Sequence, residues 1–318
     1  MSTSPFKSDD AVQLPIFDHR VQSISYARIP GQHIPFVRRV RTDGMRAAAI
    51  AVLVALVGCS SLALGPDAGG ETVTPAPVPA DDGLPPGVDQ SGTVDASVLA
   101  AAHGDLLDDA SYTLTTNRTV RSANGSLRST LDVELELSAV RNYYANVTVA
   151  GPAAPVVIGE PPTRAEYWSD DEVYLRRQAI DNRTVYSRYN GSEAYVGTWR
   201  FWLGSVALDI DPETDLYTTL RSFETRVADR SDGRVHLVGT AVSSRAFVDD
   251  QDDVATVENA TLHAFVGDDG LVASYHVVYD AVRGDGETVR VRRSVRFDTV
   301  GNTTVDRPAW YDEAMRWG

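Results

Sequence analysis

The feature that most constrains the fold is an alternation of apolar and polar residues with a period of two, which begins near residue 111. In residues 112–120 and 131–137, apolar side chains alternate with Thr, Asn, Asp and Glu, and Asn124-Gly125 lies between the two runs. Successive strand side chains point to opposite faces, and Asn-Gly favours the tight turn of a hairpin. The pattern therefore predicts an antiparallel hairpin with one apolar face and one solvent-exposed face.

The same alternation returns along the chain and predicts a large antiparallel sheet. Further strands are expected at residues 143–149, 165–168, 172–178, 184–189, 234–247, 257–266, 271–279 and 288–299. Helical spacing predicts helices at residues 95–107, 195–206 and 211–223 and a short helix after residue 307. In the first helix, Val98, Ala102 and Leu106 form the predicted buried stripe. Because apolar sheet faces need cover, we predict an α+β fold over residues 95–318, in which a curved antiparallel sheet, a half-barrel, wraps around helices.

Residues 45–59, with the sequence MRAAAIAVLVALVGC, have the pattern of a secretory signal with a lipidation site. A short positive segment precedes an apolar run, and Leu56-Val57-Gly58-Cys59 resembles the lipobox of lipoproteins. Cys59 is the only cysteine, which excludes an intrachain disulfide and favours thioether lipidation. We predict that residues 45–58 are removed and that Cys59 carries a membrane anchor. The alternatives are an uncleaved anchor that runs to Leu64 and an ordinary secreted protein.

The segments that flank this signal lie outside the predicted domain. A secretory signal belongs at an N-terminus, so we interpret residues 1–44 as the product of a mis-assigned start. The alternative is a cytoplasmic arm before a membrane span, which the cluster of Arg38, Arg39 and Arg41 favours. Residues 59–94 combine the lipidation site with a Pro- and Gly-rich linker, for which an extended and disordered conformation is expected.

The composition excludes one class of partner and indicates a compartment. The formal net charge is −15 and Lys7 is the only lysine, so nucleic acid is a poor partner. Arginine in place of lysine, with many carboxylates, is typical of salt-loving archaea. Seven of the eight asparagines after residue 60 begin an Asn-x-Ser/Thr sequon, which indicates an exported, glycosylated cell-surface protein. The predicted glycosylation sites are Asn117, Asn124, Asn146, Asn182, Asn190, Asn259 and Asn302.

The sequons also predict which side chains point inward. A glycan must project into solvent, so Asn117, Asn146 and Asn259 mark the outer face and their alternating neighbours point inward. The candidate residues for an apolar ligand cavity lie on this inward face and on the helical segments: Leu114, Val133, Leu135, Val147, Tyr195, Trp199, Trp202, Leu220, Leu262, Tyr275 and Val277. The alternative is that the same residues form a filled core.

The order of elements resembles that of known lipoprotein carriers. A lipobox, a linker, a helix, a run of strands, a helical pair and a second run of strands are similar to carriers of the LolA and LprG type. That resemblance implies an open half-barrel around an apolar cavity that holds acyl chains. The chain is also similar to an uncharacterised family of haloarchaeal lipoproteins, in the segments Ser111-Tyr112-Thr113-Leu114, Asn117-Arg118-Thr119, Glu166-Tyr167-Trp168 and Val173-Tyr174.

No motif in the sequence indicates catalysis. Gly-x-Ser-x-Gly, His-Glu-x-x-His and a glycine-rich phosphate loop are all absent from it. His263 and His276 are expected on the outer face as diagonal neighbours without a third metal ligand. We therefore expect neither an enzyme nor a bound metal or cofactor.

Two functions remain open at this stage. The first is a non-enzymatic cell-surface lipoprotein that binds or carries a lipid or another hydrophobic ligand. The second is a structural or interaction lipoprotein of the cell envelope, with a filled core and no ligand. Either protein would be lipid-anchored through Cys59 at the extracellular face of the cytoplasmic membrane.

Overall fold

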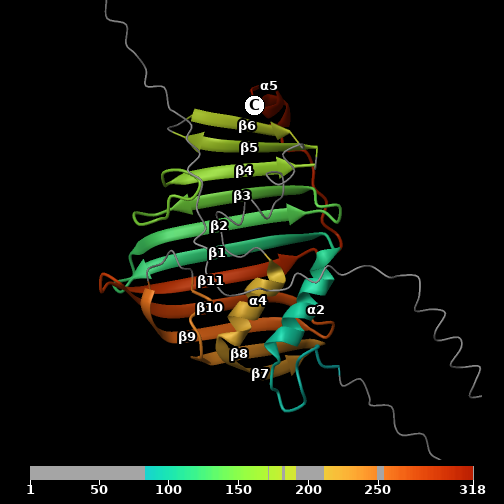
Figure 1. Cartoon of the computed structure of the whole chain (residues 1–318), viewed down its shortest axis with the longest axis vertical. Coiled ribbons are helices and arrows are strands. Elements are labelled where there is room, and N and C mark those ends of the chain that lie inside the picture. Colours follow the sequence, from blue (N-terminus) through green and yellow to red (C-terminus); the bar gives the residue numbers. More distant parts are fainter. Residues whose placement is uncertain (1–82, 171, 181–182, 191–210, 249–253, 318) are drawn as a thin grey trace, which may run out of the picture. The chain divides into compact units, whose positions relative to one another are not determined.

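The computed structural model describes residues 83–170, 172–180, 183–190, 211–248 and 254–317. Within these residues, eleven antiparallel strands form one curved sheet (Figure 1). The strands are β1 (Tyr112–Ser122), β2 (Leu127–Leu137), β3 (Tyr143–Ala150), β4 (Thr163–Ser169), β5 (Val173–Ile180), β6 (Arg183–Asn190), β7 (Phe223–Ser231), β8 (Arg234–Val242), β9 (Val254–Gly267), β10 (Val272–Arg283) and β11 (Thr288–Asp298). Their order across the sheet is β6-β5-β4-β3-β2-β1-β11-β10-β9-β8-β7, so β6 and β7 are the outermost of these strands. The predicted fold class is confirmed.

One face of the sheet, called the inner face below, carries most of the buried apolar side chains. On β3, Tyr143, Ala145 and Val147 point to this face and are 1%, 0% and 0% exposed. On β9 and β10, Leu262 and Tyr275 follow the same alternation and are 0% and 2% exposed. Burial of apolar area contributes about 25 cal/mol per Å², so this face is the main source of folding free energy. The predicted inward orientation of these residues is confirmed.

Two helices lie on the inner face. α2 (Ala96–Asp108) begins at the cap residue Asp95, and α4 (Pro212–Arg221) begins at Asp211, whose carboxylate accepts a backbone N–H of the first turn. Asp211 before a first-turn proline is the start signal that the sequence contains. The helices contact each other, and Figure 1 shows both across β7 to β11, whereas neither crosses β3 to β6.

The predicted buried stripe of α2 is wrong. Val98 and Leu106 are 46% and 38% exposed, whereas Leu99, His103 and Leu107 are 0%, 0% and 2% exposed. The buried residues follow i, i+4 spacing, which places them on one side of the helix. The error arises because a histidine interrupts the apolar stripe, and histidine is more often a surface residue.

His103 is held as a neutral base in the core. Its Nδ1 accepts the N–H of Val272 at 3.2 Å, and its ring packs edge-on against Phe297 with 4.8 Å between ring centroids. Burial lowers the pKa of His103 from 6.5 to about 4. Because this folded-state pKa lies below the unfolded value, the unfolded chain binds more protons between these pH values. The stabilising effect of neutral His103 is complete above pH 6.5 and is lost as the pH falls through about 4.

We expect this histidine alone to lower the free energy of unfolding by about 3 kcal/mol between neutral pH and its folded-state pKa. Urea unfolding followed by circular dichroism measures this effect at several pH values. His103→Gln is the control, because glutamine does not titrate while carboxylates elsewhere still do. The wild-type stability should fall more steeply with decreasing pH than that of the variant. Equal slopes would mean that the folded protein does not hold His103 neutral.

Two parts of the sheet domain were not expected from the sequence. The predicted helix extends to Phe223, but this residue begins β7, an edge strand whose charged and mostly exposed sequence hides its alternation. The outer edge of β7 is paired with residues of the predicted linker, because the N–H of Val227 donates to the carbonyl of Gly92 at 3.1 Å. Val88 is also buried, at 7% exposure. Residues 83–94 therefore pack on the sheet, where a disordered linker was expected.

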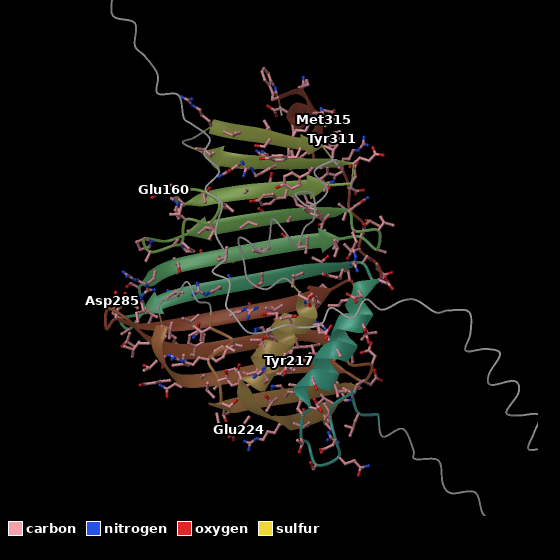
Figure 2. The ribbon with its side chains drawn as sticks, in the orientation of Figure 1. Glu160, Tyr217, Glu224, Asp285, Tyr311 and Met315 are labelled. Carbon is pink, nitrogen blue, oxygen red and sulfur yellow. The ribbon has the colours of Figure 1, made fainter. Side chains whose placement is uncertain are left out.

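The third described helix lies on the opposite, outer face of the sheet. α5 (Tyr311–Trp317) packs against β5 and β6, where Trp168, Leu175 and Ala314 share a small apolar cluster. The rings of Trp168 and Tyr311 meet edge-on at 5.0 Å, and Figure 2 shows Tyr311 beside the β6 edge. α2 and α4 thus pack on the inner face, and α5 covers the small apolar cluster on the outer face.

Candidate functional site

The candidate cavity residues that the structure describes lie on the inner face or face it. Leu114 on β1 is half-buried. The others are at most 3% exposed: Val133 and Leu135 on β2, Val147 on β3, Leu220 on α4, Leu262 on β9, and Tyr275 and Val277 on β10. Tyr195, Trp199 and Trp202 lie outside the described residues. The inward orientation is therefore established, whereas the role of these residues in binding a ligand stays a prediction.

The inner face contains a surface made only of aliphatic side chains, called the aliphatic strip below. It runs across β2 and β3, where the register pairs Val133 with Val147 and Leu135 with Ala145. Its members are Leu131, Val133, Leu135, Val147 and Val149. α2 is hydrogen-bonded to β10, and α4 packs on β7 and is hydrogen-bonded to β10 and β11. The end of α2 also meets the β2–β3 turn, where Arg141 donates to the carbonyl of Leu107. Such a surface offers an acyl chain apolar contact and no hydrogen bond.

The loop between β3 and β4 folds back onto the inner face. Ile158 is 8% exposed, and its carbonyl accepts a hydrogen bond from the amide of Gln178 on β5. Ala154 and Val157 pack against the same apolar core. The loop starts at Gly151, whose φ of +115° and close approach to the backbone of β2 leave no room for a Cβ. The loop is therefore a candidate cover for this side of the sheet.

A buried ion pair ties α4 to the sheet. Nη2 of Arg293 on β11 lies 2.7 and 2.6 Å from the two carboxylate oxygens of Asp215, and the Tyr275 hydroxyl donates to the same carboxylate. The side chains of Arg293 and Asp215 are 9% and 14% exposed. Burial alone would lower the pKa of Arg293, but the charge of Asp215 outweighs it, so that pKa is raised and the guanidinium stays charged.

Arg293 is not among the site residues predicted from the sequence, although the signal was present. The alternation that turns Val289, Val291 and Val295 inward has a period of two, and Arg293 lies between Val291 and Val295 in that series. The same rule turns Arg118 on β1 inward, where it lies directly opposite Arg293 in the register and is 7% exposed. Arginines are mostly exposed in proteins, so a period alone did not identify them as buried.

Next to the aliphatic strip, polar side chains form a second group on the inner face, called the tyrosine–arginine cluster below. The register of β3, β4, β5 and β6 places its members in two neighbouring rows: Tyr143, Tyr167, Tyr174, Arg176 and Tyr189. The ring centroids of Tyr167 and Tyr174 are 6.3 Å apart, and those of Tyr174 and Tyr189 are 5.4 Å apart. Of these residues, only Tyr143 was predicted to point inward, from its alternation with Asn146, because the other positions depend on pairing across four strands.

Burial raises the pKa of three phenols of this cluster. It raises the pKa of Tyr143 well above its ordinary value of 10, and it raises the pKa of Tyr167 to about 12. Burial also raises the pKa of Tyr174, with smaller effects from the neighbouring phenols. The charge of Arg176 acts in the opposite direction on Tyr167 and Tyr174, because Arg176 pairs with Tyr167 across the strands and lies two residues from Tyr174 on β5. At neutral pH the cluster is therefore a set of hydroxyl donors beside one positive charge.

The described sequon asparagines lie on the outer face or in turns, as the sequence predicts. Asn117 and Asn146 are half-buried, and Asn124, Asn259 and Asn302 are exposed. The side chains of Asn182 and Asn190 lie outside the described residues. Glycan attachment at these positions stays a prediction.

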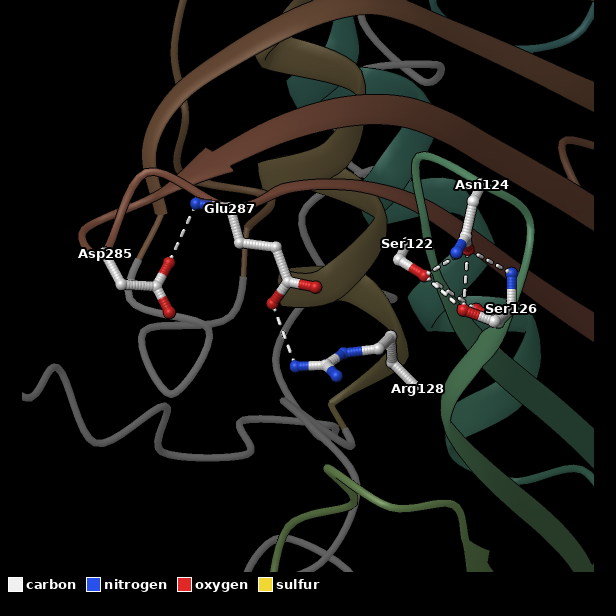
Figure 3. Close-up of polar contacts among 6 residues, drawn as sticks. All are labelled: Ser122, Asn124, Ser126, Arg128, Asp285 and Glu287. Carbon is white, nitrogen blue, oxygen red and sulfur yellow. Dashed lines mark hydrogen bonds and ion pairs between the residues drawn. The ribbon is translucent and has the colours of Figure 1, made fainter.

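Asn124 has the most open geometry for modification. It lies in the β1–β2 turn, and its Oδ1 accepts from the backbone N–H and the hydroxyl of Ser126 at 2.9 and 2.7 Å (Figure 3). By contrast, Nδ2 of Asn117 donates to Asp132, and Nδ2 of Asn259 donates to Asp280. Figure 3 also shows that the β1–β2 hairpin is held to the β10–β11 turn by the ion pair of Arg128 with Glu287, at 2.9 Å.

The histidines of the outer face differ from the predicted arrangement. His263 and His276 are direct cross-strand partners and not diagonal neighbours. A third histidine, His236, lies on β8, on the side of His263 opposite to His276. Its Nε2 is 3.0 Å from Nδ1 of His263. Its ring also stacks on Phe265. Within the part of the chain that the structure describes, no group of three or more histidine, cysteine or acidic side chains could hold a metal ion.

The described helices do not include a membrane span. None of them is both long enough and apolar enough to cross a bilayer.

The fold and its inner face define a class of protein: an open antiparallel half-barrel in which α2 and α4 cover part of the apolar face. The chain belongs to the family of unknown function DUF7537, which matches residues 45–314. A comparison with curated proteins gives no match.

Two solved structures resemble this chain at low identity. LprF from Mycobacterium bovis is 11% identical, with a TM-score of 0.34, and the match covers 67% of this chain and 97% of LprF. A domain from Vibrio parahaemolyticus described as an outer membrane lipoprotein-sorting protein is 7% identical, with a TM-score of 0.23, over 68% of this chain and 96% of the domain. Likenesses with TM-scores this low carry no argument about function.

Proposed function

We propose that this protein is a non-enzymatic cell-surface lipoprotein that binds a lipid or another hydrophobic molecule on the inner face of its sheet. The observation that carries the proposal is the aliphatic strip, because it lies beyond the strands that α2 and α4 contact and borders the β3–β4 loop. A ligand with acyl or isoprenoid chains has the chemistry to cover such a surface.

We also propose that Cys59 anchors the protein at the extracellular face of the cytoplasmic membrane, after removal of residues 45–58. The lipobox-like sequence around the only cysteine supports this anchor. The family match includes residues 45–58, which supports the signal as part of the protein. The sequons Asn117, Asn146 and Asn259 lie on the outer face, so glycans there would leave the inner face open to a ligand.

The alternative, a structural or interaction lipoprotein with a filled core, is favoured by one observation. Leu135, Val147 and Leu262 are each 0% exposed, as in a packed interior. A filled core and a closed ligand site use the same residues, so substitution within the strip separates them.

Binding of a fluorescent fatty acid by the full-length protein tests the proposal. Ala145 is 0% exposed and lies on the inner face between Leu135 and Tyr167. Ala145→Trp should fill the space beside the strip and weaken probe binding at least about tenfold. Glu134→Trp, at an exposed position on the outer face of the neighbouring strand β2, is the control and should leave binding unchanged.

The filled-core alternative predicts a different pair of results. The wild-type protein would bind no probe, and Ala145→Trp would overpack the core, which costs about 1–3 kcal/mol or more of folding stability. That combination would contradict the proposed ligand site.

A further inference from the structure

The tyrosine–arginine cluster has hydrogen-bonding capacity that its own neighbours leave unused. Among the described residues, the buried hydroxyl of Tyr143 and the buried Nε of Arg176 have no hydrogen-bond partner. Buried polar atoms are nearly always paired in folded proteins, because leaving one unpaired costs free energy. Two unpaired donors on the same face therefore indicate a place for an acceptor that the protein does not itself supply.

The cluster also carries an unbalanced positive charge. The hydrogen bond that the structure gives Arg176 goes to the neutral hydroxyl of Ser187, at 3.4 Å. No carboxylate among the described residues pairs with it, whereas Arg293 on the same face has Asp215 as its partner. A guanidinium in apolar surroundings binds an anion more strongly than one in water, because little solvent screens the attraction.

The cluster and the aliphatic strip are close enough to contact one molecule. Neighbouring strands are about 4.8 Å apart, so Val147 on β3 and Arg176 on β5 are separated by roughly 10 Å across the sheet. Tyr143 lies on the same strand as Val147. One amphiphile can therefore place its chains on the strip and its polar end on the cluster.

We propose that the tyrosine–arginine cluster binds the anionic oxygen group, a phosphate or a carboxylate, of an amphiphile whose chains lie on the aliphatic strip. This inference rests on the proposed function and names its ligand class. Neutral phenols donate hydrogen bonds to the oxygens, and Arg176 supplies the opposite charge. A neutral lipid with the same chains covers the aliphatic strip but leaves the charge of Arg176 without a partner.

Competition for a bound fluorescent fatty acid tests this preference in the full-length protein. The competitors are dioleoyl phosphatidic acid, oleic acid and diolein, which share oleoyl chains and differ in the polar end. At least one of the two anionic competitors should displace the probe about tenfold more effectively than diolein. The stronger of the two shows whether phosphate or carboxylate is the preferred group.

Two variants test whether the tyrosine–arginine cluster causes the preference for anionic competitors. Arg176→Gln should remove most of the tenfold preference and leave displacement by diolein unchanged. Tyr143→Phe should weaken the anionic competitors about fivefold. It should not lower the melting temperature of the ligand-free protein, because it deletes an unpaired hydroxyl.

Matched controls distinguish the cluster from general effects of the substitutions. Tyr112→Phe changes an equally buried inward tyrosine on β1, and Arg188→Gln changes an exposed arginine on the outer face of β6. Both should keep the preference. Equal displacement by all three competitors, or an unchanged preference in Arg176→Gln, would overturn the inference while lipid binding itself stands. Failure of the wild-type protein to bind the probe would instead contradict the proposed function.

Discussion

Asp215→Ala should lower the free energy of unfolding by about 3–5 kcal/mol, because it leaves a buried guanidinium without its counter-charge. The side chain of Arg293 is only 9% exposed, so water cannot replace the lost carboxylate. The Tyr275 hydroxyl loses its acceptor at the same time. Urea unfolding monitored by circular dichroism measures the change.

Two further variants show whether this effect belongs to the buried pair. Asp298→Ala removes the partner of Arg296 in a pair whose side chains are 36% and 66% exposed, and it should cost at most about 1 kcal/mol. The double variant Asp215→Leu/Arg293→Met replaces the pair by apolar side chains and should recover most of the lost stability. A cost of less than about 1 kcal/mol for Asp215→Ala would mean that the pair is open to solvent.

Cys59→Ser should abolish the lipid anchor. Lipid chains contribute about 0.8 kcal/mol for each buried CH₂, so their removal takes away nearly all of the binding free energy of an anchored domain. The variant should either be released into the medium or remain with the apolar run uncleaved. Fractionation of host cells and mass spectrometry of the N-terminal peptide distinguish these states.

Ser60→Ala is the control for this prediction, because it changes the adjacent residue and keeps the thiol. It should remain in the membrane fraction with a lipidated peptide that begins at Cys59. An intact peptide containing Lys7 from native membranes would contradict both the predicted start at Met45 and the predicted cleavage.

Local alternation predicted most of the strands because most of them have one buried face and one exposed face. It correctly predicted which side chains of β3, β9 and β10 point inward. The same period also places Arg293 inward, although Arg293 was not predicted to be buried. It could not predict that β1 pairs with β11, because that pairing joins segments far apart in the sequence. It also missed β7, since an exposed edge strand shows little apolar periodicity.

The candidate site could be predicted only in part, for the same physical reason. Val133, Leu135 and Val147 follow from the period of two within single strands. The tyrosine–arginine cluster depends on the register of four strands, which places Tyr143 level with Tyr174 and Tyr167 level with Arg176. No local pattern in the sequence contains that information.

Mass spectrometry of organic extracts tests the ligand-binding role most directly, using full-length protein purified from the membranes of its own host. We expect a co-purified amphiphile with an anionic polar end in the wild-type protein, and a much smaller amount in Ala145→Trp. Glu134→Trp should retain the wild-type amount. A wild-type extract with no lipid other than the anchor at Cys59 would contradict the proposed function and leave the envelope-interaction role in its place.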